Sequence, residues 1–270
     1  SFRRRLERKE KARGLSLPSP GHTAPPAHRL RYLYDQILRE SGLEPFRSQA
    51  TPFVDLLEEL VQRHEQPVWV DVGPGYGIAL RQGKRHRPQL ATYGLDPIDW
   101  YGEETARHDR PTIVAEDLWR RFGPELFDPQ YGYQRIPAFA EHARLPEPAN
   151  LISAFYATPY MEDPIKALEN LYNQLKPGGT LLIHFYPGLL VWPASEARVR
   201  RTQVLTTVVT AMREAIGEEQ VELGEDLLRI RRPDERQLRI NLTAGRRHET
   251  DSGEVRVAYT ADPTKPLVQA

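Results

Sequence analysis

The amino-acid sequence predicts an α/β fold built on a doubly wound, mostly parallel sheet. Two features of its 270 residues indicate this class. Short apolar runs of strand length alternate with segments whose apolar residues recur at helical spacing, and strands that alternate with helices form a parallel sheet covered on both faces. The last third changes to an alternation of polar and apolar residues, which is typical of antiparallel strands with one solvated face.

The composition excludes several classes of protein and several kinds of site. Basic and acidic residues are equal in number at 37 each, and no apolar run approaches the roughly 18 residues of a membrane-spanning helix, so we expect a cytoplasmic protein with no membrane span. The absence of cysteine excludes a disulfide framework, a cysteine-ligated metal and a cysteine nucleophile. The sequence also begins without the apolar core of a signal peptide.

The first 26 residues differ from the rest in charge and composition. Residues 1–13 contain seven Arg or Lys and two Glu, a local net charge of +5, and residues 14–26 are rich in proline and small polar residues. Such a segment cannot bury a core, so we expect a flexible basic arm and linker over residues 1–26. The arm has the charge to attract RNA or an acidic protein, although a solvated terminus has the same composition.

Two helices are predicted at the start of the ordered part, which we expect from Ala27. The first carries its apolar residues at helical spacing from Leu30 to Leu38 and stops at Gly42. The second has Thr51 as its N-cap and Pro52 as its first helical residue.

Four strands and one helix make up the predicted centre of the chain. The helix begins at Asp163-Pro164 and ends in the breaker run 176–179. The predicted strands are Val68–Asp71, Ala91–Asp96, Leu151–Tyr156 and Thr180–Tyr186.

The last third is predicted to contain a long amphipathic helix, Ser195–Ile216, and three antiparallel runs. The runs are Val221–Ile230, Leu238–Leu242 and Val255–Tyr259. Residues 264–270 are expected to be a frayed tail. We therefore predict one domain over residues 27–263, with an insertion at about 97–148.

A glycine-rich turn follows the first strand. Gly73, Gly75 and Gly77 stand at alternate positions, where glycine allows a tight turn and the close approach of a ligand. The nicotinamide pattern G-x-G-x-x-G fails at Ile78, and the turn contains no basic residue for phosphate. The acid in front of it, Asp71, suits a ligand that carries an amine or a cation. A plain turn is the alternative interpretation.

A second acid, Asp96, ends the next predicted strand. A carboxylate in this place can accept hydrogen bonds from both hydroxyls of a ribose. The alternative is that Asp96 caps the helix that follows.

These segments resemble the class I S-adenosylmethionine-dependent methyltransferases. The run from Asp71 to Gly77 resembles the first motif of that family, and Asp96 matches its ribose-binding acid. Residues 150–164 are similar to the family's fourth-strand segment, and residues 175–183 to the turn into its fifth strand. The resemblance covers roughly residues 68–186 and implies a seven-stranded Rossmann-like sheet, with S-adenosylmethionine as the cofactor.

The resemblance also implies which residues hold the cofactor. The three glycines would face its methionine part, Asp71 would lie near its ammonium group, and Asp96 would bind its ribose. Further contacts are implied for Pro74, Pro97 and Phe155. The fourth strand departs from the family because it begins at Asn150 instead of an aspartate.

The residue beside the adenine has two candidates. If residues 112–117 form the third strand, Asp117 is the candidate. If residues 139–146 form it, His142 is the candidate, and the other segment belongs to the insertion.

Methyl transfer from a sulfonium needs alignment of the two reactants more than a catalytic base, so no base has to be present. The candidates for a catalytic role are Tyr156, Tyr160, His184 and Tyr186, and packing in the sheet core is the alternative for each. The histidine spacing predicts no metal site.

The sequence favours a small-molecule methyl acceptor, because the core is neutral and the insertion is aromatic. RNA or protein methylation through residues 1–13 is the alternative. A third possibility is a non-catalytic subunit of an assembly that keeps the fold.

Overall fold

The computed structural model describes residues 34–44, 46–98, 120, 122–185, 190–192, 203–249 and 255–270. The basic arm and linker at residues 1–26 lie outside the described residues. So do Asp117, with the strand expected at 112–117, and Tyr186.

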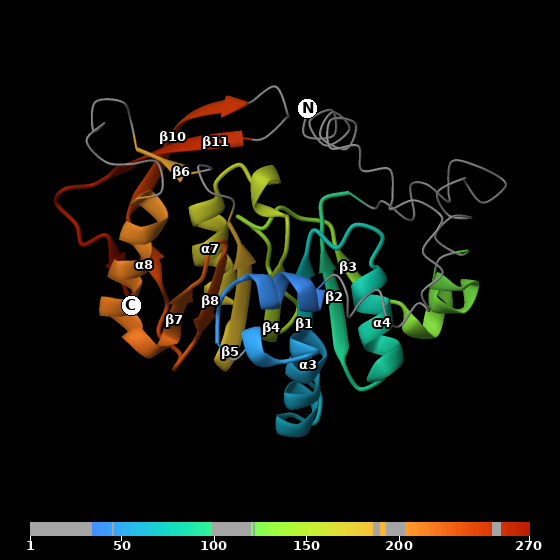
Figure 1. The fold of residues 1–270 in the computed structure, drawn as a ribbon. Helices are drawn as coiled ribbons and strands as arrows, with labels where there is room; N and C mark the ends of the chain where they lie inside the picture. The colour runs from blue at the N-terminus through green and yellow to red at the C-terminus, as the bar shows by residue number, and fades with distance from the viewer. Residues whose placement is uncertain are drawn as a thin grey trace. The chain divides into compact units, whose positions relative to one another are not determined.

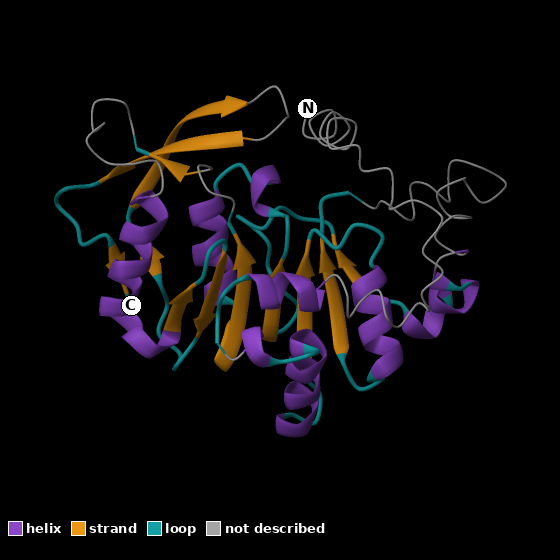
Figure 2. Cartoon of the chain, in the orientation of Figure 1, coloured by secondary structure: helices purple, strands orange, loops and turns teal. Residues whose placement is uncertain are grey.

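Helices and strands alternate from α3 to β2, and six consecutive strands, β7 to β12, end the described chain (Figures 1 and 2). The helices are α3 (Pro52–Arg63), α4 (Ile78–His86), α7 (Pro164–Asn173) and α8 (Gln203–Ile216), with residues 34–40 also helical. The strands are β1 (Val68–Val72), β2 (Ala91–Leu95), β3 (Gln134–Ile136), β4 (Ala149–Ala154), β5 (Leu175–His184), β6 (Leu190–Val191), β7 (Val221–Leu223), β8 (Leu227–Arg231), β9 (Arg239–Ile240), β10 (Leu242–Glu249), β11 (Val255–Ala261) and β12 (Val268–Gln269).

Seven strands form the main sheet, in the order β3-β2-β1-β4-β5-β8-β7. The pairs β1–β2, β2–β3 and β1–β4 are parallel, whereas β5–β8 and β7–β8 are antiparallel. The predicted fold class, a mostly parallel seven-stranded sheet with antiparallel C-terminal strands, is confirmed.

The chain divides into two compact units, which we describe separately. The glycine-loop unit comprises the described residues of Gly21–Phe139 and Ala143–Ser153, and the C-terminal unit those of Ala140–His142 and Ala154–Ala270. The single domain over residues 27–263, with an insertion at about 97–148, stays a prediction.

In the glycine-loop unit, β1 is buried along its whole length and lies between β2 and β4. The side chain of Asn150, at the start of β4, accepts a hydrogen bond from the backbone N–H of Val68 at 2.9 Å. An amide at this position therefore joins the first residue of β1 to β4, which gives Asn150 a structural role.

The predicted end of the first helix and the predicted start of the second are confirmed, and the start of the first helix lies outside the described residues. Gly42 follows the helix at residues 34–40 with φ 73°, a conformation that favours glycine. Helix α3 begins at Pro52 after Thr51, but the Thr51 side chain caps no backbone N–H. The buried carboxylate of Asp35 performs that function by accepting a hydrogen bond from the N–H of Phe53 at 2.8 Å.

Gly83 lies in the middle of α4, where glycine normally weakens a helix. A Cβ at this position would lie 2.5 Å from Cζ3 of Trp69, a fully buried side chain of β1. The missing side chain therefore allows α4 to pack against the indole ring.

We expect Gly83→Ala to destabilise the protein by about 1–3 kcal/mol, because overpacking against Trp69 outweighs the gain in helix propensity. Chemical denaturation measures this effect. In a Trp69→Phe background the same substitution should cost less. A gain of about 1 kcal/mol in the unchanged background, as for an ordinary helix position, would contradict this interpretation.

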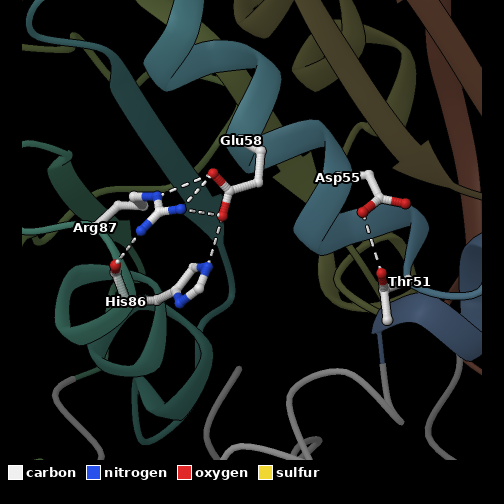
Figure 3. A network of polar contacts seen from close by, with 5 residues as sticks. All are labelled: Thr51, Asp55, Glu58, His86 and Arg87. Atoms are coloured by element: carbon white, nitrogen blue, oxygen red, sulfur yellow. Dashed lines mark hydrogen bonds and ion pairs between the residues drawn. The ribbon is translucent and has the colours of Figure 1, made fainter.

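An ion-pair network links α3 to the end of α4 (Figure 3). The Arg87 guanidinium donates to both carboxylate oxygens of Glu58, with Nε 3.0 Å from Oε2 and Nη2 2.6 Å from Oε1. His86 Nε2 lies 2.7 Å from the same carboxylate. The hydrogen bond from Arg87 is the main reason that the pKa of Glu58 is lowered.

We expect Glu58→Gln to lower the free energy of unfolding by about 1 kcal/mol at low salt and by less at high salt. Because the pKa of Glu58 is lower in the folded state, its contribution is complete above the unfolded pKa and disappears as the pH falls through the folded pKa. Thermal unfolding between pH 3 and 7 measures it. The matched control is Glu59→Gln, which removes an exposed pair with Arg63 and should change little.

In the C-terminal unit, the start of α7 is as predicted and its end is not. Asp163 caps α7 by accepting a hydrogen bond from the N–H of Lys166 at 3.0 Å. The helix ends at Asn173, and residues 175–179 belong to the ten-residue strand β5, so the predicted boundary at 176–179 is wrong. The physical reason is pairing with β8, where the N–H of Gly178 donates to the carbonyl of Arg232 at 2.7 Å.

The prediction of a third strand at residues 139–146 is wrong, because those residues form turns and irregular structure. The strand beside β2 is β3, with Leu95 opposite Ile136. It is only three residues long and lacks an apolar run, which explains why the sequence pattern did not reveal it.

Only the first of the three predicted antiparallel runs enters the main sheet. It forms the two strands β7 and β8, whereas β10 and β11 lie side by side in a separate sheet with β6 (Figure 1). The frayed tail predicted for residues 264–270 is wrong near its end, because β12 pairs with β9 and buries Val268. None of the helices that the structure describes is long and apolar enough to cross a membrane.

Candidate functional site

The glycine turn lies at the carboxyl ends of β1 and β2. Gly73, Gly75 and Gly77 have φ of 70°, 56° and 69°, so the turn uses a backbone conformation that other residues rarely adopt. The N–H of Gly73 donates to the carbonyl of Leu95 at 2.9 Å, which joins the turn to the end of β2. The turn and Asp96 therefore belong to one edge of the parallel sheet, where ligands bind in folds of this kind.

Gly75 and Gly77 differ in the space around them. A Cβ at Gly77 would overlap the ring of Tyr133, and a Cβ at Gly94 on β2 would lie 2.5 Å from Cε2 of the same ring. These two glycines make room for a tyrosine that also lies under the guanidinium of Arg81, 5.6 Å from its ring centroid. Gly77 and Gly94 therefore serve internal packing.

Gly75 is different, because a Cβ built on it would meet no atom within 4 Å. Its backbone faces open space, as a turn that receives a ligand requires. Of Gly75 and Gly77, Gly75 is the position where a side chain would project into open space, although its left-handed backbone would be strained by any side chain.

The acid before the turn is held by protein groups. Asp71 is 1% exposed, and its Oδ2 accepts a hydrogen bond from the Tyr34 hydroxyl at 2.8 Å. Its Oδ1 accepts one from Ser153 Oγ at 2.6 Å, and the same Oγ accepts from the Trp69 indole at 2.9 Å. This arrangement differs from the expectation that Asp71 faces the ammonium of a ligand. The reason is its place inside β1, where the side chain points into the packed face of the sheet.

The environment of Asp71 favours the neutral carboxyl group. Burial is the largest effect and raises the pKa of Asp71 to about 7, although the hydrogen bonds from Ser153 and Tyr34 act in the opposite direction. The pKa of Tyr34 is raised as well. Burial is the largest cause, and the nearby Asp71 is the second.

Asp96 directly follows β2 and is also buried. Its backbone N–H donates to the carbonyl of Ile136 at 3.2 Å, and its Oδ1 accepts from the N–H of Ile98 at 2.8 Å. The carbonyl of Pro97 accepts a hydrogen bond from Arg135 at 2.9 Å. The backbone bond and the Arg135 contact attach this acid and its loop to β3.

The other residues predicted to bind the cofactor lie in different settings. Pro74 packs near Gly94, where its Cγ would be 3.0 Å from an added Cβ. In the C-terminal unit, Phe155 is buried after β4 and His142 is exposed in a turn. Their contacts with a cofactor stay predictions, as does the choice of residue beside the adenine.

Two of the predicted catalytic candidates come together in the C-terminal unit. The rings of Tyr156 and His184 are 5.0 Å apart between centroids and meet edge to face at 63°. His184 Nε2 lies 2.6 Å from Oδ2 of Asp226, a residue that the sequence analysis did not single out. Tyr160 ends the short 3-10 helix Thr158–Tyr160 and is half-buried.

The structure adds Tyr34, Ser153, Tyr133 and Asp226 to the predicted site residues. No sequence signal marked the first three, because each is joined to its partner by the fold across long stretches of chain. Asp226 could have been found from its place in the turn of a hairpin, Val221 to Arg231, that follows an acidic segment.

Comparison with known proteins supplies independent information. The model of a family described as "Methyltransferase domain" matches residues 30–202, more than half of the chain. A trans-aconitate 2-methyltransferase from Pseudomonas aeruginosa is 29% identical over 138 residues, which cover 51% of this chain and 42% of that relative. The matched part is thus less than half of the relative's length.

Several solved structures are similar to part of this chain. One is CalS10 with bound S-adenosylmethionine, an amino pentose methyltransferase from Micromonospora echinaspora, at 17% identity and a TM-score of 0.33, covering 60% of this chain and 57% of that one. Another is YjhP from E. coli, at 19% identity and a TM-score of 0.36, covering 70% and 71%.

Proposed function

The chain belongs to the methyltransferase-domain family, the class I S-adenosylmethionine-dependent methyltransferases, and we propose that it transfers a methyl group from this cofactor to a small molecule. The observation that carries the proposal is the open backbone at Gly75, in a left-handed turn joined to the end of β2.

The residues at this edge of the sheet fit the cofactor. Gly73 and Gly75 offer backbone without side chains to its methionine part, and the Asp96 carboxylate is placed after β2 to accept the ribose hydroxyls. Pro74 and Pro97 flank these contacts. The bound cofactor would supply the activated methyl group, and the protein's part is to bind it, orient the acceptor and exclude water.

Asp71 contributes indirectly under this proposal. Its carboxylate joins Tyr34 and Ser153 to β1, the strand that leads into the turn, and under this proposal it does not contact the ligand itself. A neutral carboxyl group can keep that role, because it still has an acceptor oxygen and gains a donor.

The name of the curated relative supports a small-molecule acceptor and makes trans-aconitate a natural first probe. The balanced charge of the chain agrees with this choice. Calorimetry with S-adenosylmethionine and S-adenosylhomocysteine tests the cofactor. Labelled methyl transfer to trans-aconitate, and to a small-molecule filtrate of a cell extract, tests the acceptor. No heat of binding at millimolar cofactor would contradict the proposal.

We expect Gly75→Ala to weaken S-adenosylhomocysteine binding by roughly 10- to 100-fold, equivalent to about 1.4–2.8 kcal/mol, because the methyl group enters the space of the ligand. The left-handed backbone should also cost about 1–2 kcal/mol of stability. Calorimetry and thermal unfolding measure the two effects separately.

The matched control for this substitution is Gly42→Ala. Gly42 has φ 73° and also has no atom within 4 Å of an added Cβ, so the backbone cost should be the same. The affinity of the Gly42→Ala variant for S-adenosylhomocysteine should equal that of the unchanged chain. Equal losses of affinity in the two variants would show that strain, and not occupancy of the turn, weakens binding.

A further inference from the structure

We propose that Tyr156 forms part of the surface that contacts the methyl acceptor, and that His184 and Asp226 position its ring. The inference rests on the proposed function and goes beyond it by assigning an acceptor-side residue and the pair that holds it.

The first observation is the backbone of Tyr156. Among the non-glycine residues that the structure describes, Tyr156 alone has a positive φ, at 57°. A bulky aromatic residue in this conformation is strained, and such residues concentrate at sites of function because the surrounding structure must hold them in place. Glycine would adopt the same backbone without strain, so a purely structural turn does not need tyrosine here.

The second observation is exposure. Tyr156 is 39% exposed, whereas its neighbours Phe155 and Ala157 are buried. The strained backbone therefore turns one aromatic ring outward, immediately after β4, instead of packing it in the core. A core role does not explain this position.

The third observation is the pair that supports the ring. His184 is buried at the end of β5, with its imidazole ring packed against the Tyr156 ring and its Nε2 2.6 Å from the Asp226 carboxylate. An ionised carboxylate only accepts hydrogen bonds, so Asp226 fixes the tautomer with the proton on Nε2 and with it the ring orientation.

The backbone around the pair is fixed as well. The hydroxyl of Thr158 donates to the carbonyl of His184 at 2.6 Å, and the N–H of Phe185 donates to the carbonyl of Asp226 at 2.7 Å. These bonds join the loop after β4 to the end of β5, and that end to the β7–β8 turn. The three side chains therefore form one ordered series from Asp226 through His184 to Tyr156.

The first experiment separates the ring from the strain. Tyr156→Ala removes the ring and keeps the strain of a left-handed backbone, whereas Tyr156→Gly keeps that backbone conformation but removes both the ring and the strain. We expect the glycine variant of the full chain to unfold a few degrees above the alanine variant, because alanine is strained in the left-handed conformation and glycine is not. Ala157→Gly, at a residue with φ −86°, is the control and should lower the unfolding temperature.

The second experiment measures labelled methyl transfer to trans-aconitate and to the small-molecule filtrate. The alanine and glycine variants should both lose about tenfold or more in kcat/KM for the acceptor, while the KM for S-adenosylmethionine stays within about twofold. Tyr156→Phe keeps the ring and should retain most of the activity. A structural role would instead make activity follow the unfolding temperature.

The third experiment addresses the positioning pair by nitrogen NMR of the His184 ring, without any ligand. Asp226→Ala should shift the tautomer away from the Nε2–H form and lower acceptor kcat/KM, and Asp226→Asn, which still offers an acceptor oxygen, should restore both. An unchanged ring spectrum in Asp226→Ala would overturn the positioning role.

The outcomes distinguish the two proposals. A full chain that neither binds S-adenosylhomocysteine nor transfers label contradicts the proposed function, and the acceptor role of Tyr156 with it. A chain that transfers label equally well with alanine, glycine or tyrosine at position 156 contradicts only the role of Tyr156. A glycine variant less stable than the alanine variant also overturns it, because the strain argument then fails.

Discussion

Asp71→Asn is expected to become more stable relative to the unchanged chain as the pH rises. The difference between their free energies of unfolding should change in favour of the variant by up to about 4 kcal/mol between about pH 4 and about pH 7. Burial raises the pKa of this carboxyl group from 3.8 to about 7 in the folded protein. Each unit of difference between the folded and unfolded pKa corresponds to about 1.36 kcal/mol.

The sign follows from proton binding. Below about pH 4 Asp71 is protonated in both states and has no effect on the pH dependence. Between about pH 4 and 7 the folded state keeps a proton that the unfolded state has lost, so this residue makes stability fall as the pH rises. Above about pH 7 both states are ionised and the penalty is constant. Asparagine has no proton to lose, so the variant lacks this decline.

Urea denaturation of both chains at several pH values measures the difference. The raised pKa of Asp35, about 6, acts in the same direction but is present in both chains and cancels in the comparison. The two curves should run parallel above about pH 7. A constant difference from pH 4 to 8 would contradict a buried carboxyl group that titrates near neutrality.

Asp71→Ala is the control that separates charge from hydrogen bonding. It leaves the hydroxyls of Tyr34 and Ser153 without their acceptor in a buried place, at a cost of about 1–3 kcal/mol for each group. We therefore expect the alanine variant to be less stable than the asparagine variant at every pH. Equal stability of the two would show that the hydroxyls find other partners.

The sequence predicted those features that depend on neighbouring residues. The apolar run of β1, the three left-handed glycines and the proline that starts α3 are local signals, and each is present. The strands of the main sheet were found wherever an apolar run marked them. The three-residue β3 has no such run and was missed. Of the two places predicted for the third strand, residues 139–146 form no strand and residues 112–117 lie outside the described residues.

The features that were not predicted depend on residues far apart in the chain. Tyr34 and Asp71 are 37 positions apart, and Asp71 and Ser153 are 82 positions apart. No periodicity or spacing joins such residues, because the fold brings them together only after the sheet has formed. The sequence therefore did not reveal that Asp71, the acid of the first motif, is hydrogen-bonded to Tyr34 and Ser153, and its contact with a ligand stays a prediction.

The end of α7 shows the same effect more strongly. The guanidinium that reaches the last carbonyls of this helix comes from Arg232, which directly follows β8 and is 59 positions from Asn173. Its Nη1 donates to the carbonyls of Asn173 and Leu175, at 3.1 and 2.6 Å. Its Nη2 donates to the carbonyls of Glu235 and Arg236, at 2.6 and 3.2 Å.

Arg232→Met is expected to lower the free energy of unfolding by about 3–5 kcal/mol, the range for breaking a buried charged network. Arg232 is 5% exposed, and methionine fills part of the same volume but donates no hydrogen bond. Four backbone carbonyls then lose their donor at the junction of α7, β5 and the loop after β8. The contact of the guanidinium with the Tyr172 ring, 5.8 Å from its centroid, is lost as well.

Two further variants test this explanation. Arg232→Lys keeps the charge but cannot reach four carbonyls with one planar fork, so its stability should fall between those of the unchanged chain and Arg232→Met. Arg231→Met is the matched control, because Arg231 is the adjacent residue at the end of β8 and is exposed, so its loss should stay within about 0.5 kcal/mol. Chemical denaturation ranks all three. A loss below about 1 kcal/mol for Arg232→Met would mean that water replaces the guanidinium at these carbonyls and that the end of α7 does not depend on it.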